Sequence, residues 1–190
     1  MLNRPFVILT GALLTLNVAL PPQSTAQSKA TEASTGKGAI EIPKSLRVEH
    51  EAIHSALVEA TRAPGQVGAA ARELAAVLHP HFVREEEIAL PPLGLLAPLS
   101  TGASVPDSAL SEALAMTDAL RSEMPRMLEE HKQIEAAVER LRLAARAEQA
   151  GMHEQLAEEL ALHAKTEEEV LYPAALLVGD IIRARQQSKH

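Results

Sequence analysis

Two stretches of this 190-residue sequence decide its fold: residues 81–91, HFVREEEIALP, and residues 163–173, HAKTEEEVLYP. At a constant offset of 82 residues they share a histidine, three consecutive glutamates and a proline. A second alignment, at an offset of 81 residues, pairs His50 with His131. The chain therefore looks like two copies of one helical hairpin, although a repeat of this length is also compatible with duplication of a packing unit alone.

Four segments around these stretches have the spacing of an amphipathic helix, with apolar residues every three or four positions. They are residues 45–62, 66–90, 107–150 and a last segment that follows Gly151. The sequence shows no strand pattern. It therefore predicts an all-α fold, an up-down-up-down four-helix bundle over residues 44–187.

Prolines mark the irregular positions of this predicted bundle. Pro80 lies inside the second segment, where a missing N–H predicts a kink. Pro125 predicts an interruption of the third segment, and the proline-rich residues 91–106 predict a long connection with apolar patches.

The predicted buried faces carry histidine and glutamate where apolar residues are expected. His81 and Glu85 are four residues apart, as are His163 and Glu167, so each pair lies on one helix face. Burying an unpaired carboxylate costs several kcal/mol, and none of the four predicted faces carries lysine or arginine. We therefore expect a metal as the compensating charge, and oxygen and imidazole donors suit iron, manganese or zinc.

Two cations bridged by the two carboxylates fit this set better than one. His50 and His131 supply donors from the other two helices. His54 lies four residues after His50 and is a candidate fifth histidine, whereas Glu135 occupies the equivalent position of the repeat. The predicted metal ligands are His50, His54, His81, Glu85, His131, His163 and Glu167. The alternative is a metal-free bundle in which the glutamates satisfy the buried histidines.

Other polar residues near these positions are assigned to solvent or to packing. The residues predicted to face solvent are His79, Glu86, Glu87, Glu168 and Glu169. Tyr172 lies off the predicted metal-facing stripe and is assigned to packing, and Phe82 is a candidate wall of the pocket. No catalytic residue is assigned.

These motifs resemble the hemerythrin-like family, the HHE cation-binding domains. The resemblance covers about residues 45–177 and rests on His50, His81-Phe82-x-x-Glu85-Glu86, Glu130-His131 and His163-x-x-x-Glu167-Glu168-x-x-x-Tyr172-Pro173. It implies a non-haem diiron centre in which Glu85 and Glu167 bridge two irons and the histidines complete the ligand shell. It also implies an open position that binds dioxygen.

The third predicted helix departs from the family pattern. Oxygen-carrying members have two histidines four residues apart there, whereas this chain has His131 with Glu135, and has His50 with His54 on the first helix. The repeat exchanges the first and third helices, so a five-histidine set could form with His54 in place of the histidine missing from the third helix. A six-ligand centre with altered reactivity is the other possibility. Ferritin-like diiron bundles need two Glu-x-x-His units, and this chain offers one candidate, Glu51 with His54, so that fold is rejected.

Composition excludes several other functions. The chain has no cysteine, which rules out disulfides, thiolate metal sites and a thiol nucleophile. The net charge is −7 and the aromatic residues number only three, so neither a basic patch nor a stacking platform for nucleic acid is expected. An exported domain without disulfides is expected to draw part of its stability from its metal.

The first 26 residues have the layout of a secretory signal peptide. A short positive start precedes the 15-residue apolar run Phe6–Leu20, and a small, polar segment ends at Ala26. The apolar run is shorter than the roughly 20 residues of a membrane span. We expect cleavage near Ala26, a flexible linker over residues 27–43, and an exported protein, periplasmic or secreted, without stable membrane insertion. An uncleaved membrane anchor is the alternative.

The sequence thus predicts an exported hemerythrin-like diiron protein that binds dioxygen or a related small ligand, such as another diatomic molecule or peroxide. Carriage, sensing, storage and scavenging all remain open. One alternative is a diiron oxidoreductase that reduces peroxide or nitric oxide. The other is a metal-free or zinc-bound structural bundle. Manganese and zinc are the alternatives to iron as the bound metal.

Overall fold

The computed structural model describes residues 40–188. They belong to the second of the two units into which the chain divides, residues 36–190. The predicted signal peptide, and the predicted linker up to residue 39, lie outside the described residues.

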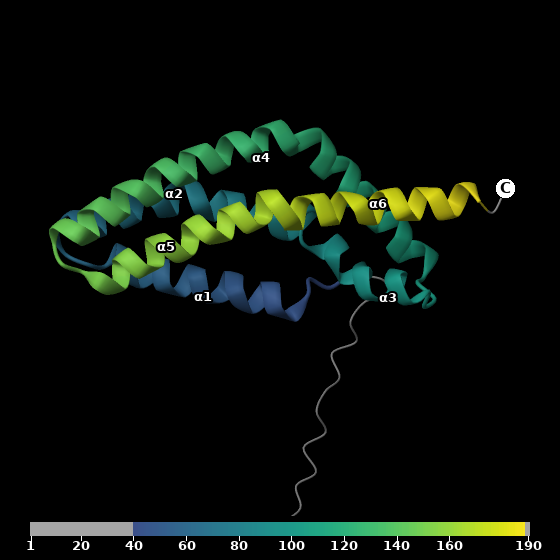
Figure 1. Ribbon diagram of the computed structural model, residues 1–190, viewed down its shortest axis with the longest axis horizontal. Helices are drawn as coiled ribbons and strands as arrows, with labels where there is room; N and C mark the ends of the chain where they lie inside the picture. The colour runs from purple at the N-terminus through teal and green to yellow at the C-terminus, as the bar shows by residue number, and fades with distance from the viewer. Residues whose placement is uncertain (1–39, 189–190) are drawn as a thin grey trace, which may run out of the picture. The chain divides into compact units, whose positions relative to one another are not determined.

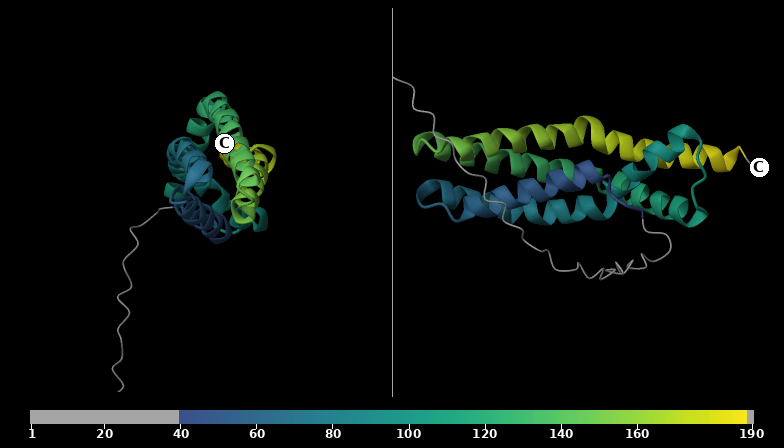
Figure 2. Two further views of the ribbon diagram at one scale, coloured as in Figure 1. Left: turned by 90° about the vertical axis from the view of Figure 1, so that its left-hand side faces the viewer. Right: turned by 90° about the horizontal axis from the view of Figure 1, so that it is seen from below.

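Residues 40–188 fold into helices without a strand, so the all-α prediction is confirmed. The α-helices are α1 (Lys44–Thr61), α2 (Gly65–Ile88), α3 (Leu96–Thr101), α4 (Asp107–Ala147), α5 (Gly151–Thr166) and α6 (Tyr172–Gln187). Two short segments join them, the 3-10 helix η1 (Pro91–Leu95) and the π-helix η2 (Glu167–Leu171). In the bundle, α1 packs on α2 and α5, while α4 packs on α2, α5 and α6 (Figures 1 and 2).

Two apolar clusters fill most of the bundle interior. The larger lies among α1, α2, α4 and α5 and includes Leu74, Ile134 and Leu160. The second includes Ile88 and Met127, together with residues of η1 and α6. Along α4, His131 lies in sequence between the two clusters, and along α2 Glu85 does. Burial of the apolar faces on both sides therefore fixes the helices that carry the site.

Helix α4 runs without a break through Pro125, so the predicted interruption is wrong. A proline inside a helix removes one backbone hydrogen bond and bends the axis, and Figure 1 shows that α4 bends along its length. Packing against α2, α5 and α6 holds both halves of α4 in one helix. Helix α2 likewise continues through Pro80, which is exposed.

The segment predicted as a long connection, residues 91–106, is partly helical and partly buried. It contains η1 and α3, and Leu95 and Leu99 form a third apolar cluster with Val178 and Ile182 of α6. The last residues of the predicted linker also pack here, since Ile42 lies against the second cluster and Ile40 against the third. A side chain at Gly94 would collide with the backbone carbonyl of Glu41, so a glycine permits this close approach.

The π-helix η2 changes which residues of the last helix face the interior. The N–H of Tyr172 donates to the carbonyl of Glu167, five residues earlier, instead of the usual four. A regular α-helix that buries His163 and Glu167 would also bury Val170, but Val170 is 54% exposed and Tyr172 is 1% exposed. The extra residue in the turn rotates the rest of the helix about its axis, so Tyr172 turns inward to the stripe from which the sequence excludes it.

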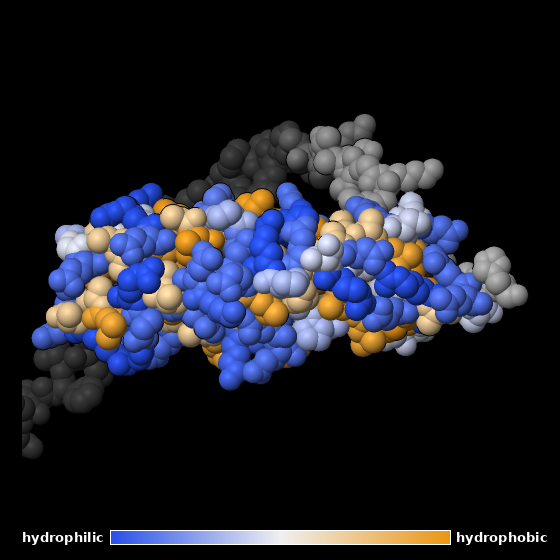
Figure 3. Space-filling view, turned by 90° about the horizontal axis from the view of Figure 1, so that it is seen from above, coloured by the Kyte–Doolittle hydropathy of each residue, from blue (hydrophilic) through white to orange (hydrophobic). Residues whose placement is uncertain are grey.

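None of the described helices combines the length and the apolar character needed to cross a bilayer. The face of the bundle drawn in Figure 3 is largely hydrophilic, with small separate apolar areas. Single exposed apolar residues of this kind are normal on a protein surface.

Candidate metal centre

Six of the predicted ligands converge in the bundle interior. They come from α1, α2, α4, α5 and the start of η2, and each is at most 4% exposed. They are His50, His81, Glu85, His131, His163 and Glu167. Their nitrogen and oxygen atoms form two groups, within each of which all the atoms lie no more than 4.8 Å apart, and such groups could hold metal ions.

The first group joins His81 and Glu85 of α2 to His131 of α4 and Glu167. The Nε2 atoms of the two histidines are 2.8 Å apart. The Nε2 of His81 is 3.5 Å from Glu85 Oε1, and the Nε2 of His131 is 3.5 Å from Glu167 Oε2. Two imidazoles and two carboxylates therefore face one point.

The second group joins His50 of α1 to His163 of α5 and, again, Glu167. Glu167 Oε1 is 2.8 Å from the Nε2 of His163 and 3.5 Å from the Nε2 of His50. Glu85 also reaches this group, since its Oε2 is 4.0 Å from His50 Nε2. Each buried carboxylate thus extends one oxygen toward each pair of histidines.

The two groups are related by the sequence repeat. The offset of 82 converts His81 and Glu85 into His163 and Glu167, and the offset of 81 converts His50 into His131. This exchange turns the first group into the second and leaves the carboxylate pair between them. The duplicated hairpin therefore forms one centre with two nearly equivalent halves.

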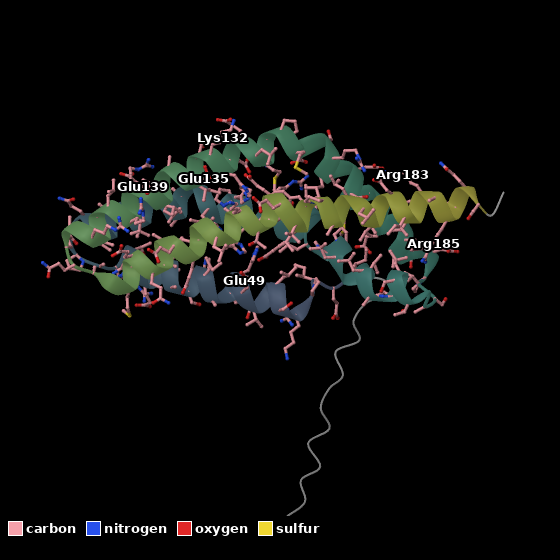
Figure 4. The ribbon with its side chains drawn as sticks, viewed as in Figure 1. Glu49, Lys132, Glu135, Glu139, Arg183 and Arg185 are labelled. Carbon is pink, nitrogen blue, oxygen red and sulfur yellow. The ribbon has the colours of Figure 1, made fainter. Side chains whose placement is uncertain are left out.

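A second layer of carboxylates holds the opposite nitrogen of every histidine. Glu130 accepts from His81 Nδ1 at 2.9 Å, and Glu49 accepts from His163 Nδ1 at 3.1 Å. Glu49 is labelled on α1 in Figure 4. In the neutral imidazole, a proton on Nδ1 leaves Nε2 with its lone pair directed at the centre, which is the tautomer that a metal ligand needs.

Glu86 and Glu168 complete this second layer, although Glu86 is exposed as predicted and Glu168 is partly exposed. Glu168 accepts from His131 Nδ1 at 2.8 Å, and Glu86 accepts from His50 Nδ1 at 3.3 Å. The sequence carried a signal for them, since each directly follows one of the buried glutamates. The pairs Glu49–Glu130 and Glu86–Glu168 also obey the offsets of the repeat.

Several polar atoms of the centre lack hydrogen-bond partners. The buried unpaired side-chain atoms among residues 40–188 are five, and four of them are His50 Nε2, His163 Nε2, Glu85 Oε2 and Glu167 Oε1. The ion-pair partners of Glu85 and Glu167 in the described chain are histidines. Leaving such atoms unpaired in a dry interior is costly, so the donor set fits a bound cation.

The carboxylates also shift the protonation of their neighbours. Burial lowers the pKa of His163, but the adjacent carboxylates of Glu167 and Glu49 outweigh it and raise the pKa to about 9. Burial opposes ionisation of Glu167, yet His163 and His50 lower its pKa to about 2. Burial and the adjacent charge of Glu167 raise the pKa of Glu85. Two carboxylates this close resist sharing full negative charge unless a cation lies between them.

Tyr172 packs in the second apolar cluster, as the sequence predicts, but its hydroxyl also contacts the first group. Its hydroxyl donates to Glu85 Oε1 at 2.5 Å and lies 3.0 Å from His131 Nε2 and 3.3 Å from His81 Nε2. Burial and the carboxylates of Glu85 and Glu167 raise its pKa. Helical spacing alone misses this residue, because η2 places it five residues after Glu167 on the same face.

The structure places His54 outside the centre. Its side chain is exposed, and its ring lies 5.9 Å from that of His79 on α2. Glu135 is also exposed, on the same helix as the exposed Lys132, and both are labelled in Figure 4. Phe82 stacks on His50 with ring centroids 4.2 Å apart, so it forms part of the wall as predicted.

Two surface hollows reach the second group. One, of about 330 Å³, is lined by both His54 and His79 and extends to His50. The other, of about 520 Å³, lies between α1 and α5 and extends to His163. Both hollows end at the imidazole rings, because the Nε2 atoms of His50 and His163 are themselves buried.

Comparison of the chain with protein-family models, with curated proteins and with solved structures gives no match. The case for a metal at this position therefore depends on the side chains themselves.

Proposed function

We propose that the chain is an exported, hemerythrin-like diiron protein whose up-down-up-down bundle binds dioxygen or a related small ligand. One observation carries the proposal: Glu85 and Glu167 each direct one oxygen to each of two histidine pairs. Carboxylates in this position can bridge two cations. Iron would supply redox capacity and an open coordination position at such a centre.

The donor chemistry supports iron over the other candidate metals. The centre offers imidazole nitrogen and carboxylate oxygen without sulfur, a set that suits iron, manganese and zinc. Structural zinc prefers four closed ligands around one ion, whereas two shared carboxylates favour a pair of ions. Reversible binding of dioxygen requires a redox-active metal, and zinc has no redox chemistry.

Iron content and the optical spectrum test the proposal. We expect two irons per wild-type chain, one for each histidine group, and a spectrum that changes with oxygen. Both properties should be lost in the double variant Glu85→Ala with Glu167→Ala, because both shared carboxylates disappear. The control is Glu87→Ala with Glu169→Ala, which alters exposed neighbours. Protein from iron-replete cells that holds almost no iron would contradict the proposal, and stoichiometric zinc would favour a structural bundle.

The alternative function is reduction of peroxide or nitric oxide by the same centre. The hollow that reaches His50 supports it, because His54 and His79 line this hollow and could deliver protons to a bound substrate. Turnover with peroxide and with nitric oxide separates the two functions. Wild-type rates no higher than those of free iron would leave the binding function alone.

Export is part of the proposal and has its own test. The mass of the protein recovered outside the cytoplasm should correspond to a chain that begins at Gln27. A full-length mass in the membrane fraction would instead support the uncleaved anchor.

A further inference from the structure

Three lone-pair atoms and a carboxylate oxygen crowd together in the first group. Nδ1 of His81 and of His131 donates to Glu130 and Glu168, so in the neutral imidazoles both Nε2 atoms carry lone pairs. These Nε2 atoms are only 2.8 Å apart, so the lone pairs face each other. The oxygen of Tyr172 lies within 3.3 Å of both.

When both imidazoles are neutral, as metal ligands must be, hydrogen bonding cannot satisfy this cluster. The phenol of Tyr172 has one proton, and it is already donated to Glu85 Oε1. No hydrogen-bond donor is then left for the lone pair of either Nε2 atom. A cation placed among the four atoms would satisfy all of them at once.

The sequence repeat shows that the other half lacks this donor. Leu90 is the residue equivalent to Tyr172 at the offset of 82, and it reproduces the same backbone turn. The N–H of Leu90 donates to the carbonyl of Glu85 at 2.9 Å, as the N–H of Tyr172 does to Glu167. A leucine side chain has no atom that can bind a metal. The two halves therefore have equivalent backbone turns, but only the first has a phenol oxygen.

We propose that the phenol oxygen of Tyr172 is the fifth protein donor to the metal held by His81 and His131. A small ligand from solution, such as dioxygen, therefore binds the metal held by His50 and His163. This inference rests on the proposed function. The first metal receives two imidazoles, two carboxylates and a phenolate, whereas the second receives two imidazoles and the same two carboxylates. Binding replaces the phenol proton by the metal, and the proton is released to solvent.

The positions of the surface hollows agree with binding of the external ligand at the second metal. The two surface hollows extend to His50 and to His163, which belong to the half with fewer donors. The apolar residues Ile88, Leu90 and Met127 pack in the same cluster as Tyr172. The phenol is therefore held in place by packing as well as by its polar contacts.

The sequence makes the spectroscopic test specific, because Tyr172 is the only tyrosine and there is no tryptophan. Any phenolate-to-iron(III) charge-transfer band must come from this residue. We expect the oxidised iron protein to show the band, and Tyr172→Phe to lose it completely while keeping two irons per chain. Leu90→Met, at the equivalent buried position, is the matched control and should keep both the band and the iron.

Zinc gives a second readout that does not depend on iron chemistry. On addition of zinc to the metal-free protein, wild type should develop the near-ultraviolet absorption of tyrosinate. It should also release one more proton per chain than Tyr172→Phe. Circular dichroism shows whether each variant retains its helices, so an unfolded variant cannot be mistaken for a loss of coordination.

Azide, an anionic ligand of iron(III), tests which of the two metals binds a ligand from solution. We expect one azide per wild-type chain and two per Tyr172→Phe chain, because the substitution opens a position on the first metal. An unchanged azide stoichiometry would overturn this part of the inference. Two irons in wild type without a phenolate band would overturn the phenolate ligand and leave the proposed function intact. Absence of bound metal in wild type would overturn both.

Discussion

Each buried histidine of the centre is oriented by a carboxylate on a different helix. His81 of α2 is held by Glu130 of α4, and His163 of α5 by Glu49 of α1. Such contacts fix both the tautomer and the ring direction, so the metal-facing nitrogens are set before any ion binds. The affinity of the centre should therefore depend on residues that never touch the metal.

Replacing Glu130 by Gln tests this dependence. We expect about 10- to 100-fold weaker metal binding, because the amide no longer supplies a charged acceptor to His81 Nδ1. Competition with a chelator of known affinity measures the change. Glu129→Gln is the control, since this exposed residue pairs with Lys132 on the outside of α4. Equal affinities of the two variants would show that the second layer has no such role.

The position of His54 leads to a second prediction at this scale. His54→Ala should leave the metal content unchanged, because its exposed ring lies beside His79 and not in the centre. His50→Ala should lower the metal content, because it removes one of the two imidazoles of the second group. Metal analysis of both variants distinguishes them, and a loss of metal in His54→Ala would restore the five-histidine set predicted from the sequence.

At the scale of elements, the five-residue π-helix η2 sets the orientation of helix α6, which begins directly after it. An α-helix places successive residues about 100° apart, so one extra residue in a turn rotates the whole downstream segment by about that amount. The rotation brings Tyr172 into the interior and leaves Val170 in solvent. Sequence periodicity could not reveal this, because the extra residue carries no sequence mark of its own.

Deleting Val170 should convert η2 into regular α-helix and keep the centre. Tyr172 would then lie four residues after Glu167, so both side chains keep one face, and the deleted side chain is 54% exposed. We expect wild-type metal content and helix content by circular dichroism. Deleting Leu162, which is 67% exposed, is the control. It rotates His163 and Glu167 away from Leu160 and should abolish metal binding. Loss of metal in the Val170 deletion would contradict this account of the turn.

At the scale of the whole molecule, the polar centre separates two apolar clusters of one bundle. Two imidazole nitrogens and two carboxylate oxygens are buried without hydrogen-bond partners. They destabilise the metal-free fold, because burial removes them from water without compensation. The chain also has no cysteine and so no disulfide to offset that cost. Metal binding and folding should therefore be coupled.

Removal of the metal should lower the melting temperature. A metal present at a hundredfold excess over its Kd stabilises the native state by about 2.7 kcal/mol. For a domain of this size that corresponds to a fall of roughly 5–10 °C after chelation. Thermal unfolding followed by circular dichroism measures it. The Glu85→Ala with Glu167→Ala variant should show no shift with chelator, and an unchanged wild-type melting temperature after complete removal would contradict the coupling.

Residue spacing was enough to predict the helical class, the duplicated hairpin, and the four histidines and two glutamates that converge. It could do so because helical periodicity and the repeat act along the chain, and both are visible in residue spacing. Only the tertiary structure decided the exclusion of His54, the second layer of carboxylates and the entry of Tyr172. These depend on contacts between helices and on one five-residue backbone turn, and spacing within a single helix does not encode either.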